Sequence, residues 1–565
     1  MRFLLHEYIS LLKEDGELDS LITDLLIGMN LVPLSKPQRG RQHGVDISAI
    51  GIDKEDGLKK VFLIAVKQGN LTRTNWDSGT NSVRPTLNEI KDTYVNIAFS
   101  KKYQKLPKKV IVCTNGVMNQ TVQIDWTQYI NKNSENNLEF DFWGIGEISQ
   151  MLDEYLITEK LFPEEFQSLL RKTLAFLDLP DYKMTHFYIL IDKVFEIKYK
   201  QKKKVLKQMR LLRLCLSIIF KWSQDIENIK PSIYASERSI LKCWDWLHKN
   251  ELLDEKYIFP EFYKLHLLKR EIGITFFNKV YDNYRIQHSI YRYSKNSLEY
   301  SLTIWEHIGI LAIIGLTEMK EAQFNYASNS NKVDKATEIY LNSGNVIAET
   351  LNHLIMLNPP SNYPEYDEHS IEIALALKLF YSTTKFDKAK DWIYALSVGI
   401  SDAFVIKQFF PLFRTNYDKL VDIYIGNEKC DIQSSMLLTL LLEWSIILDE
   451  KLIYDSLKKT IKDNFKDVNL QLWFPEKETE NFLCNSDYSA NSGSNKHSIA
   501  LYEEMKDFKN EIIEEKEIFN EEKDFEFIKV GYDLIGHIAS RHYRSQPLPI
   551  FWRSLIKNED PLKKV

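Results

Sequence analysis

Cysteine is scarce in this chain, and the few cysteines form no recognisable pattern. The 565 residues include five, with no CxxC or CxxxH spacing among them. Zinc sites need closely spaced ligands, and disulfide frameworks need paired cysteines. The sequence therefore predicts neither kind of site and favours a reducing cytosol. The five are Cys113, Cys215, Cys243, Cys430 and Cys484.

Long apolar runs are also missing. A membrane-spanning helix needs about 20 consecutive apolar residues. The segment LTIWEHIGILAIIGL (302–316) comes nearest, but Glu306 and His307 interrupt it, which indicates a buried helix. The opening stretch, MRFLLHEYISLLKEDGELD, carries acids and no small-residue cleavage site, unlike a secretory signal. We expect a soluble cytoplasmic protein that makes no contact with a membrane.

The sequence contains no P-loop, no dinucleotide fingerprint and no nucleophile elbow. Nucleotide hydrolysis and acyl transfer therefore have no support. The formal net charge is −6, with 44% hydrophobic and 27% charged residues, as in an ordinary globular protein. Charge at the level of the whole chain does not indicate nucleic-acid binding, although it is compatible with a local basic surface.

What the sequence does contain changes along its length. Residues 1–160 alternate between strand-like and helix-like segments, which predicts an α/β domain with a central mixed sheet flanked by helices. Residues 161–483 show aromatic-rich helical patterns without a fixed repeat, which predicts a large all-α region. Residues 484–565 read as a polar linker, an acidic helix and a C-terminal helical segment.

The stretch RQHGVDISAIGIDKEDGLKKVFLIAVKQG (41–69) predicts a β-hairpin. Asp56-Gly57 suits the two-residue centre of a type I′ turn. Counting outward from it, paired positions sum to 113, so Asp46 is expected opposite Lys67 at the open end. Side chains alternate between the faces of a strand, so Ala65 shares the face of Lys67 and Asp46.

An acid and a lysine on one face of neighbouring strands suit phosphodiester hydrolysis. Asp46 would hold a divalent cation, Mg²⁺ or Mn²⁺, which lowers the pKa of an attacking water. The ammonium of Lys67 would orient that water or neutralise charge developing in the transition state. Gly44, just before the acid, would allow a close backbone approach. The alternative is an ordinary salt bridge across the hairpin.

The order of segments resembles the PD-(D/E)XK nucleases, and in particular the Mrr-like restriction endonuclease branch. A helix, a GVD strand, an apolar strand ending in Lys-Gln and the strand VIVCTNG follow one another over roughly residues 15–155. The resemblance implies that Asp46 ligates the metal and that Lys67 is the catalytic lysine. It places the supporting acid of the first helix, a second metal ligand, at Asp19, with Glu17 as a competitor.

In the same resemblance, Gln68 stands where relatives carry a polar residue after the lysine, and Thr114 and Asn115 are structural. One position departs from the family pattern. The acidic or amide residue two places before the lysine is Ala65, which cannot ligate a metal. Either another group substitutes, such as the acid of the first helix, Gln68 or the carbonyl of Val66, or the site is inactive.

Four basic residues near the hairpin are expected to contact the substrate. Arg41 and His43 precede the acid, and Arg73 and Arg84 lie in the segment 69–85, which also contains a tryptophan. Guanidinium groups match phosphate geometry, so these residues suit the backbone of a nucleic acid. The alternatives are a turn histidine without a catalytic role and a flexible polar connection.

Two further segments allow two interpretations each. The basic run 198–214 is either a solvated helix face or a track for nucleic acid. The C-terminal segment 541–554, RHYRSQPLPIFWRS, mixes arginine, aromatic residues and a Pro-x-Pro bend. It is either a recognition patch or a tail that docks on its own domain.

Together these features predict a metal-dependent DNA endonuclease of a bacterial restriction or antiphage defence system. The helical region would serve for sensing, for homo-oligomer formation or for binding a sister defence subunit. The alternatives are a catalytically degenerate nuclease fold that binds nucleic acid or a partner without cutting, and a scaffold subunit in which the α/β domain only oligomerises.

Overall fold

The computed structural model describes residues 2–34, 44–78, 82–95, 103–135, 137–155, 164–179, 182–196, 198, 201–412, 417–428, 433–485, 493–494, 499–518 and 520–556. Arg41 and His43 lie outside these residues. The chain forms two compact units. The first comprises Met1–Ala235 and Lys256–Phe262, and the second comprises Ser236–Glu255 and Tyr263–Val565.

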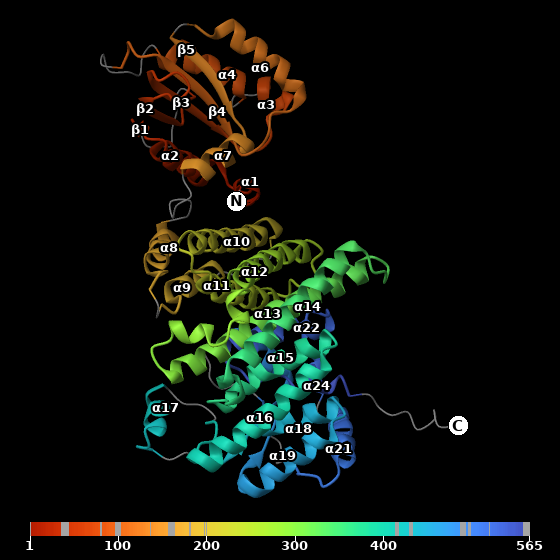
Figure 1. Ribbon diagram of the computed structural model, residues 1–565. Helices are drawn as coiled ribbons and strands as arrows, with labels where there is room; N and C mark the ends of the chain where they lie inside the picture. The colour runs from red at the N-terminus through yellow and green to blue at the C-terminus, as the bar shows by residue number, and fades with distance from the viewer. Residues whose placement is uncertain are drawn as a thin grey trace. The chain divides into compact units, whose positions relative to one another are not determined.

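A five-stranded mixed sheet organises the N-terminal part of the first unit (Figure 1). Strands follow one another in chain order across it. The first three pair antiparallel, whereas the third, fourth and fifth run parallel. This confirms the predicted α/β architecture with a central mixed sheet. The strands are β1 (Val32–Pro33), β2 (Ile47–Ile52), β3 (Lys59–Lys67), β4 (Lys108–Thr114) and β5 (Leu138–Trp143).

Both faces of the sheet are covered by helices, and strand β3 is buried from its second to its eighth residue. Leu63 and Ala65 on one face belong to a core that includes aromatic residues from the helices. Within it, the ring centroids of Trp76 and Trp126 lie 5.9 Å apart, edge to face. The alternate residues of β3, among them Ile64, are buried on the opposite face. A strand buried on both sides reads as a continuous apolar run, as KKVFLIAVK does.

The helices of the first unit come before, between and after the strands. They are α1 (Arg2–Ile9), α2 (Asp19–Gly28), α3 (Arg73–Asp77), α4 (Val83–Glu89), α6 (Gln120–Asn133), α7 (Ile145–Tyr155), α8 (Glu164–Phe176), α9 (Thr185–Val194) and α10 (Lys202–Asp225), with π-helical turns η1 (Glu14–Leu18) and η2 (Ile90–Tyr94).

The segment 69–85, expected to be a polar loop, instead contains α3 and the start of α4. Thr72 caps α3, its hydroxyl accepting a hydrogen bond from the N–H of Asn75. Trp76 is only 2% exposed and belongs to the core. It therefore cannot serve as the exposed aromatic residue of a substrate loop.

The β2–β3 hairpin has a different register from the predicted one. The N–H of Asp53 bonds to the carbonyl of Leu58, so the loop spans four residues, and paired positions sum to 111. A type I′ turn requires positive φ at two positions, but only Gly57 has it, at 74°. The regular pairing ends at Ile47 opposite Ile64, and the N–H of Asp46 bonds to the carbonyl of Ile64, so Asp46 does not lie opposite Lys67 as predicted.

The second unit is almost entirely helical, which confirms the predicted all-α region. Its four short strands have two residues each: β6 (Ser434–Ser435), β7 (Asn469–Leu470), β8 (Phe474–Pro475) and β9 (Gly493–Ser494). The helices from the second half of the chain, with the two that lead into them, are α11 (Lys230–Lys249), α12 (Ile258–Val280), α13 (Ser297–Ser328), α14 (Lys335–Leu357), α15 (Ser370–Ser382), α16 (Phe386–Lys407), α17 (Tyr417–Tyr424), α18 (Leu437–Ile447), α19 (Lys451–Asn464), α20 (Glu480–Leu483), α21 (Met505–Ile518), α22 (Glu526–Lys529), α23 (Leu534–Tyr543) and α24 (Ile550–Arg553).

Helix α13 is the central helix of this unit and packs against α14 and α15 (Figure 1). Among the described residues, it alone is long and apolar enough to cross a membrane. However, 72% of its most apolar window is buried inside the protein. The buried helix predicted at 302–316 is thereby confirmed.

The C-terminal segment is held inside the second unit by buried ion pairs between arginine and glutamate. The guanidinium of Arg541 pairs with Glu237, and that of Arg553 donates to Glu443 at 3.1 Å. All four residues are buried. Buried ion pairs are tolerated only when their hydrogen bonds are satisfied. A guanidinium group can satisfy a carboxylate by donating two parallel hydrogen bonds to it. The segment 541–554 therefore docks on its own domain.

A buried glutamate near this segment makes stability depend on pH. Burial raises the pKa of Glu522 to about 8, although the hydrogen bond that it accepts from the N–H of Ile550 acts to lower this pKa. The carboxyl group binds its proton more tightly in the folded protein than in the unfolded chain. The stability that this adds is therefore complete below the unfolded pKa and is lost as pH rises toward 8. We expect Glu522→Gln to gain stability relative to wild type between pH 5 and pH 8, by a few kcal/mol at about 1.4 kcal/mol per pKa unit.

Urea unfolding at each pH measures this difference. Glu514→Gln, an exposed residue of α21, is the matched control and should follow the wild-type curve. Parallel pH profiles for wild type and Glu522→Gln would contradict the expectation.

Candidate active site

A cavity of about 410 Å³ lies where strands β3 and β4 end. Lys67 and Gln68 contribute to its wall, together with Thr114 from the end of β4. The carboxyl ends of adjacent parallel strands meet at one edge of a sheet, where α/β proteins commonly bind ligands. The other polar lining residues are Glu14, Asn70, Asn75, Ser78 and Ser82.

Asp46 lies immediately beside the end of β3. Its Oδ2 accepts a hydrogen bond of 2.7 Å from the N–H of Val66, the residue before Lys67. Its own N–H donates to the carbonyl of Ile64 at 2.9 Å. The structure thus brings the predicted acid and the predicted lysine to the same end of β3. The acid is anchored by the backbone of the strand that carries the lysine.

Glu14 is the acid of the N-terminal helices that reaches this cavity. Its Oε1 lies 3.9 Å from Nζ of Lys67, and its Oε2 accepts a hydrogen bond of 3.1 Å from the N–H of Gln68. The sequence pattern pointed instead to two later acids of KEDGELD, Glu17 and Asp19. Glu14 lies in η1, which separates α1 from α2, so counting turns back along α2 does not identify it.

Glu17 and Asp19 make other contacts. Glu17 pairs with Lys207, and this pair and the N–H of Lys13 hold its pKa below the usual value, although burial acts the other way. Asp19 begins α2, and its Oδ1 accepts a hydrogen bond of 2.6 Å from the N–H of Ser20. Neither residue lines the cavity.

Asn115 ties the segment that carries Glu14 to the segment that follows Lys67. Its Nδ2 donates to the carbonyls of Ile9 and Leu12, and its Oδ1 accepts from the N–H of Gly69 at 2.7 Å. Gln68 adds a hydrogen bond from Nε2 to the same Leu12 carbonyl. These contacts agree with a structural role for Asn115, as the resemblance implied. They also make Gln68 a positioning residue.

Two glycines allow the close packing around the cavity. Gly44 has a φ of 83°, and a Cβ there would lie 2.9 Å from the carbonyl oxygen of Thr86. A Cβ on Gly116 would lie 2.4 Å from the backbone of Gly69. The expected close backbone approach before Asp46 is therefore present, against the first turn of α4.

The two described basic residues expected to bind substrate are exposed. Arg73 begins α3, on which Asn75 lines the cavity. Arg84 pairs with Asp77 at 3.2 Å. Surface pairs of this kind contribute little to stability, so the guanidinium of Arg84 can exchange Asp77 for a phosphate.

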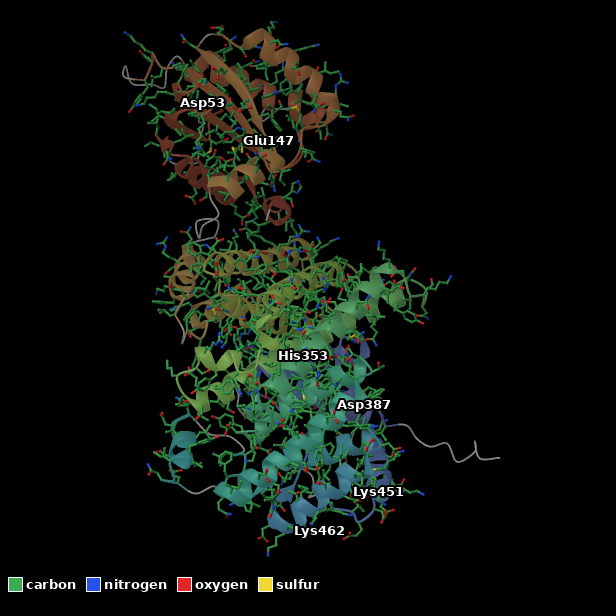
Figure 2. All side chains as sticks on the ribbon, viewed as in Figure 1. Asp53, Glu147, His353, Asp387, Lys451 and Lys462 are labelled. Atoms are coloured by element: carbon green, nitrogen blue, oxygen red, sulfur yellow. The ribbon has the colours of Figure 1, made fainter. Side chains whose placement is uncertain are left out.

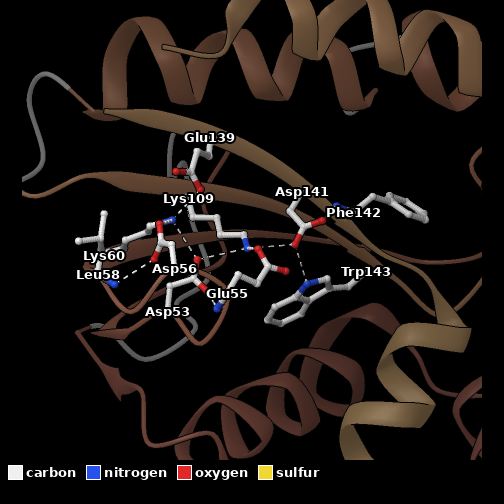
Figure 3. A network of polar contacts seen from close by, with 10 residues as sticks. All are labelled: Asp53, Glu55, Asp56, Leu58, Lys60, Lys109, Glu139, Asp141, Phe142 and Trp143. Carbon is white, nitrogen blue, oxygen red and sulfur yellow. Dashed lines mark hydrogen bonds and ion pairs between the residues drawn. The ribbon is translucent and has the colours of Figure 1, made fainter. Parts of the chain in front are cut away.

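A second group of acids lies at the opposite end of the hairpin (Figure 3). One oxygen from each of Asp53, Asp56 and Glu139 lies within 4.8 Å of the others, close enough to hold a metal ion. Instead, Nζ of Lys60 lies 3.1, 2.6 and 2.7 Å from their respective carboxylates. Burial acts to lower the pKa of Lys60, but these three partners raise it.

Lys109 extends this network toward β5 (Figure 3). Its Nζ lies 3.3 Å from Asp53, 2.5 Å from Glu55 and 3.5 Å from Asp141. Burial acts to raise the pKa of Asp53, yet its hydrogen bonds and the two ammonium groups lower it. Two lysines thus occupy the positions that a cation would take among these acids. We call these residues the lysine–carboxylate network.

No family model matches the sequence, and comparisons with curated proteins and with solved structures give no match. The chemistry of the site therefore has to be inferred from its own residues.

Removing Lys60 should free the acidic triad for a metal ion. We expect Lys60→Ala to destabilise the α/β part, because Asp56 and Glu139 lose their ammonium partner and Asp53 keeps only Lys109 of its two. Millimolar Ca²⁺ or Mn²⁺ should then raise the melting temperature of the variant more than that of wild type. Lys59→Ala, at an exposed neighbouring position, is the control. Equal stability of the two variants, with or without metal, would contradict this role for Lys60.

Proposed function

We propose that the protein is a metal-dependent DNA endonuclease with its active site at the end of strand β3. The observation that carries the proposal is the gathering of Lys67, Glu14 and Asp46 at one end of a mixed sheet. Lys67 and Glu14 line the cavity there, and Asp46 is bonded to the residue before Lys67. The order helix, antiparallel hairpin and parallel strand agrees with the arrangement that the resemblance to PD-(D/E)XK nucleases implies.

The donor atoms of this site fit a hard divalent cation. Asp46 and Glu14 each use one carboxylate oxygen to accept a backbone N–H, at 2.7 and 3.1 Å. Carboxylates, backbone carbonyls and water are the ligands that Mg²⁺ and Mn²⁺ prefer. Glu14 thereby supplies an acid where Ala65, 1% exposed and packed in the core, cannot.

A bound Mg²⁺ or Mn²⁺ would lower the pKa of a coordinated water and polarise the phosphate. The residues of the chain then have separate tasks. The ammonium of Lys67 neutralises charge that develops on the phosphate oxygens in the transition state. Its 3.9 Å approach to Glu14 fixes its direction. Gln68 and Asn115 hold the Glu14 segment against the end of β3, so the acid and the lysine keep their separation.

The wider proposal is a role in restriction or antiphage defence in the cytoplasm, with the helical region binding a trigger, another copy of the chain or a sister subunit. Arg73, Arg84, Arg41 and His43 are the proposed contacts to the DNA backbone. Phosphate contacts position a nucleic acid without reading its sequence.

Plasmid cleavage with Mg²⁺, Mn²⁺ or EDTA tests the proposal. We expect metal-dependent cutting that Lys67→Ala, Asp46→Asn and Glu14→Gln each reduce by about 10²–10³-fold, the usual cost of removing one group that stabilises transition-state charge. Asp19→Asn is the matched control, because its carboxylate accepts a hydrogen bond from the N–H of Ser20 and does not line the cavity. It should keep wild-type activity.

Metal-dependent cutting that survives Lys67→Ala would overturn the proposed site. Loss of cutting in Asp19→Asn but not in Glu14→Gln would move the supporting acid back to the position that the resemblance implied.

A catalytically degenerate nuclease fold is the second candidate, and Ala65 is the observation that favours it. If wild type does not cut under any of these conditions, Ala65→Glu restores the missing family acid. Cutting by that variant alone would show that Ala65 silences the site. DNA binding that persists in EDTA and weakens steeply with salt would then support a non-cutting nucleic-acid-binding subunit.

A further inference from the structure

A cavity of about 500 Å³ lies in the second unit, far along the chain from the site above. Helices α13, α14, α15 and α23 contribute its walls. Its volume falls within the range of about 300–1,000 Å³ typical of small-molecule sites. Four ionisable residues line it: Lys320, Lys378, Asp533 and His537.

The two lysines of this cavity differ in how well their charges are satisfied. Nζ of Lys320 donates to Oε1 of Gln323 at 2.6 Å and to the carbonyl of Gly531 at 3.2 Å, and it pairs with Asp533. Its three N–H groups therefore all have partners. Among the described residues, Nζ of Lys378 donates only to the carbonyl of Phe551, at 2.9 Å, and none of their carboxylates lies within ion-pair distance. Two of its N–H groups are therefore left for the cavity.

His537 offers a second unsatisfied group. It is 4% exposed, lines the cavity, and its Nε2 has no hydrogen-bond partner. The nearest carboxylate oxygen, on Asp533, is 4.0 Å from Nε2. Burial lowers the pKa of His537 to about 3, so the imidazole is neutral at pH 7. A buried polar atom without a partner is rare in native proteins and indicates a missing water or ligand.

The charges around the cavity do not balance. Two ammonium groups face one carboxylate, and the imidazole is neutral, which leaves one positive charge. Burial lowers the pKa of Lys378. The charge of Asp533 acts to raise this pKa, and the charge of Lys320 acts to lower it further. Burying an ammonium without a counter-ion is costly. A single negative charge placed near Lys378 would remove this cost.

We propose that this cavity binds a small organic anion with one negatively charged group, a carboxylate or a phosphate ester. The anionic oxygens accept hydrogen bonds from Nζ of Lys378 and from Nε2 of His537 in the tautomer that carries its proton there. The N-terminus of α23, which begins at Leu534 in the same wall, adds a favourable dipole.

The rest of the lining defines the body of the ligand. The apolar side chains in the lining of the cavity include Leu316, Met319, Tyr326, Leu341 and Tyr381. Such walls suit an aliphatic or aromatic body, whereas a polyphosphate would bring more negative charge than the one excess positive charge can balance. The site is independent of the proposed nuclease activity, since none of its residues belongs to the first unit.

Thermal shift and calorimetry on the full chain at pH 7 test the proposal with simple probes. Phenylacetate and phenyl phosphate present one aromatic ring and one anionic group, and they distinguish the two anion classes. Phenylacetamide and phenethylamine are the matched neutral and cationic probes. We expect saturable binding of at least one anion. The neutral and cationic probes should bind at least about tenfold more weakly than that anion, because charged hydrogen bonds are the strong ones.

Two variants locate the site. Lys378→Met keeps the length of the side chain and should weaken the anion by about tenfold or more, given the charged hydrogen bonds that it removes. Lys451→Met removes the same charge from an exposed helix, α19, where the residue is labelled in Figure 2, and should bind as wild type does. Leu341→Trp leaves the charges in place and should block binding by filling the cavity.

No binding of either anion to wild type would overturn the proposal. Undiminished binding in both Lys378→Met and Leu341→Trp would also overturn it, since the anion would then bind elsewhere. If Lys378→Met does not fold, Leu341→Trp alone decides the outcome.

Discussion

The burial of strand β3 on both faces is the constraint on which the α/β part depends. Between Lys60 and Val66 the strand contributes apolar side chains to two helical layers, so it can carry reactive charge only where it enters and leaves the core. Lys60 stands at one end and Lys67 at the other. The lysine–carboxylate network and the candidate active site are therefore at opposite ends of the same strand.

The two ends use charge differently. At the Lys60 end, two ammonium groups are packed against several carboxylates, and the result is a closed ion-pair network. At the Lys67 end, one lysine lies 3.9 Å from one acid beside a cavity. A closed network stabilises a fold with its partners in place, whereas an open one can accept a ligand. This difference distinguishes the two groups of acids more clearly than their residue types do.

The helical unit follows a related principle. Its C-terminal segment enters the core with arginines, and nearly every buried guanidinium meets a glutamate, as Arg541 meets Glu237 and Arg553 meets Glu443. Lys378 departs from this pattern because it faces a cavity and has, within the described part of the chain, a backbone carbonyl as its hydrogen-bond partner instead of a carboxylate. A charge without a counter-ion among many well-paired charges is what draws attention to the second cavity.

The sequence by itself determined the class of each region. Apolar runs at strand length and helical periodicity gave the mixed sheet and the all-α region, because hydrophobic patterning is a local property. Only the tertiary structure decided the hairpin register, where side-chain bonds of Asp53 and Asp56 shape a four-residue loop. It alone decided that Glu14 reaches Lys67, because Asn115 and Gln68, more than 50 residues away in sequence, bring the two segments together.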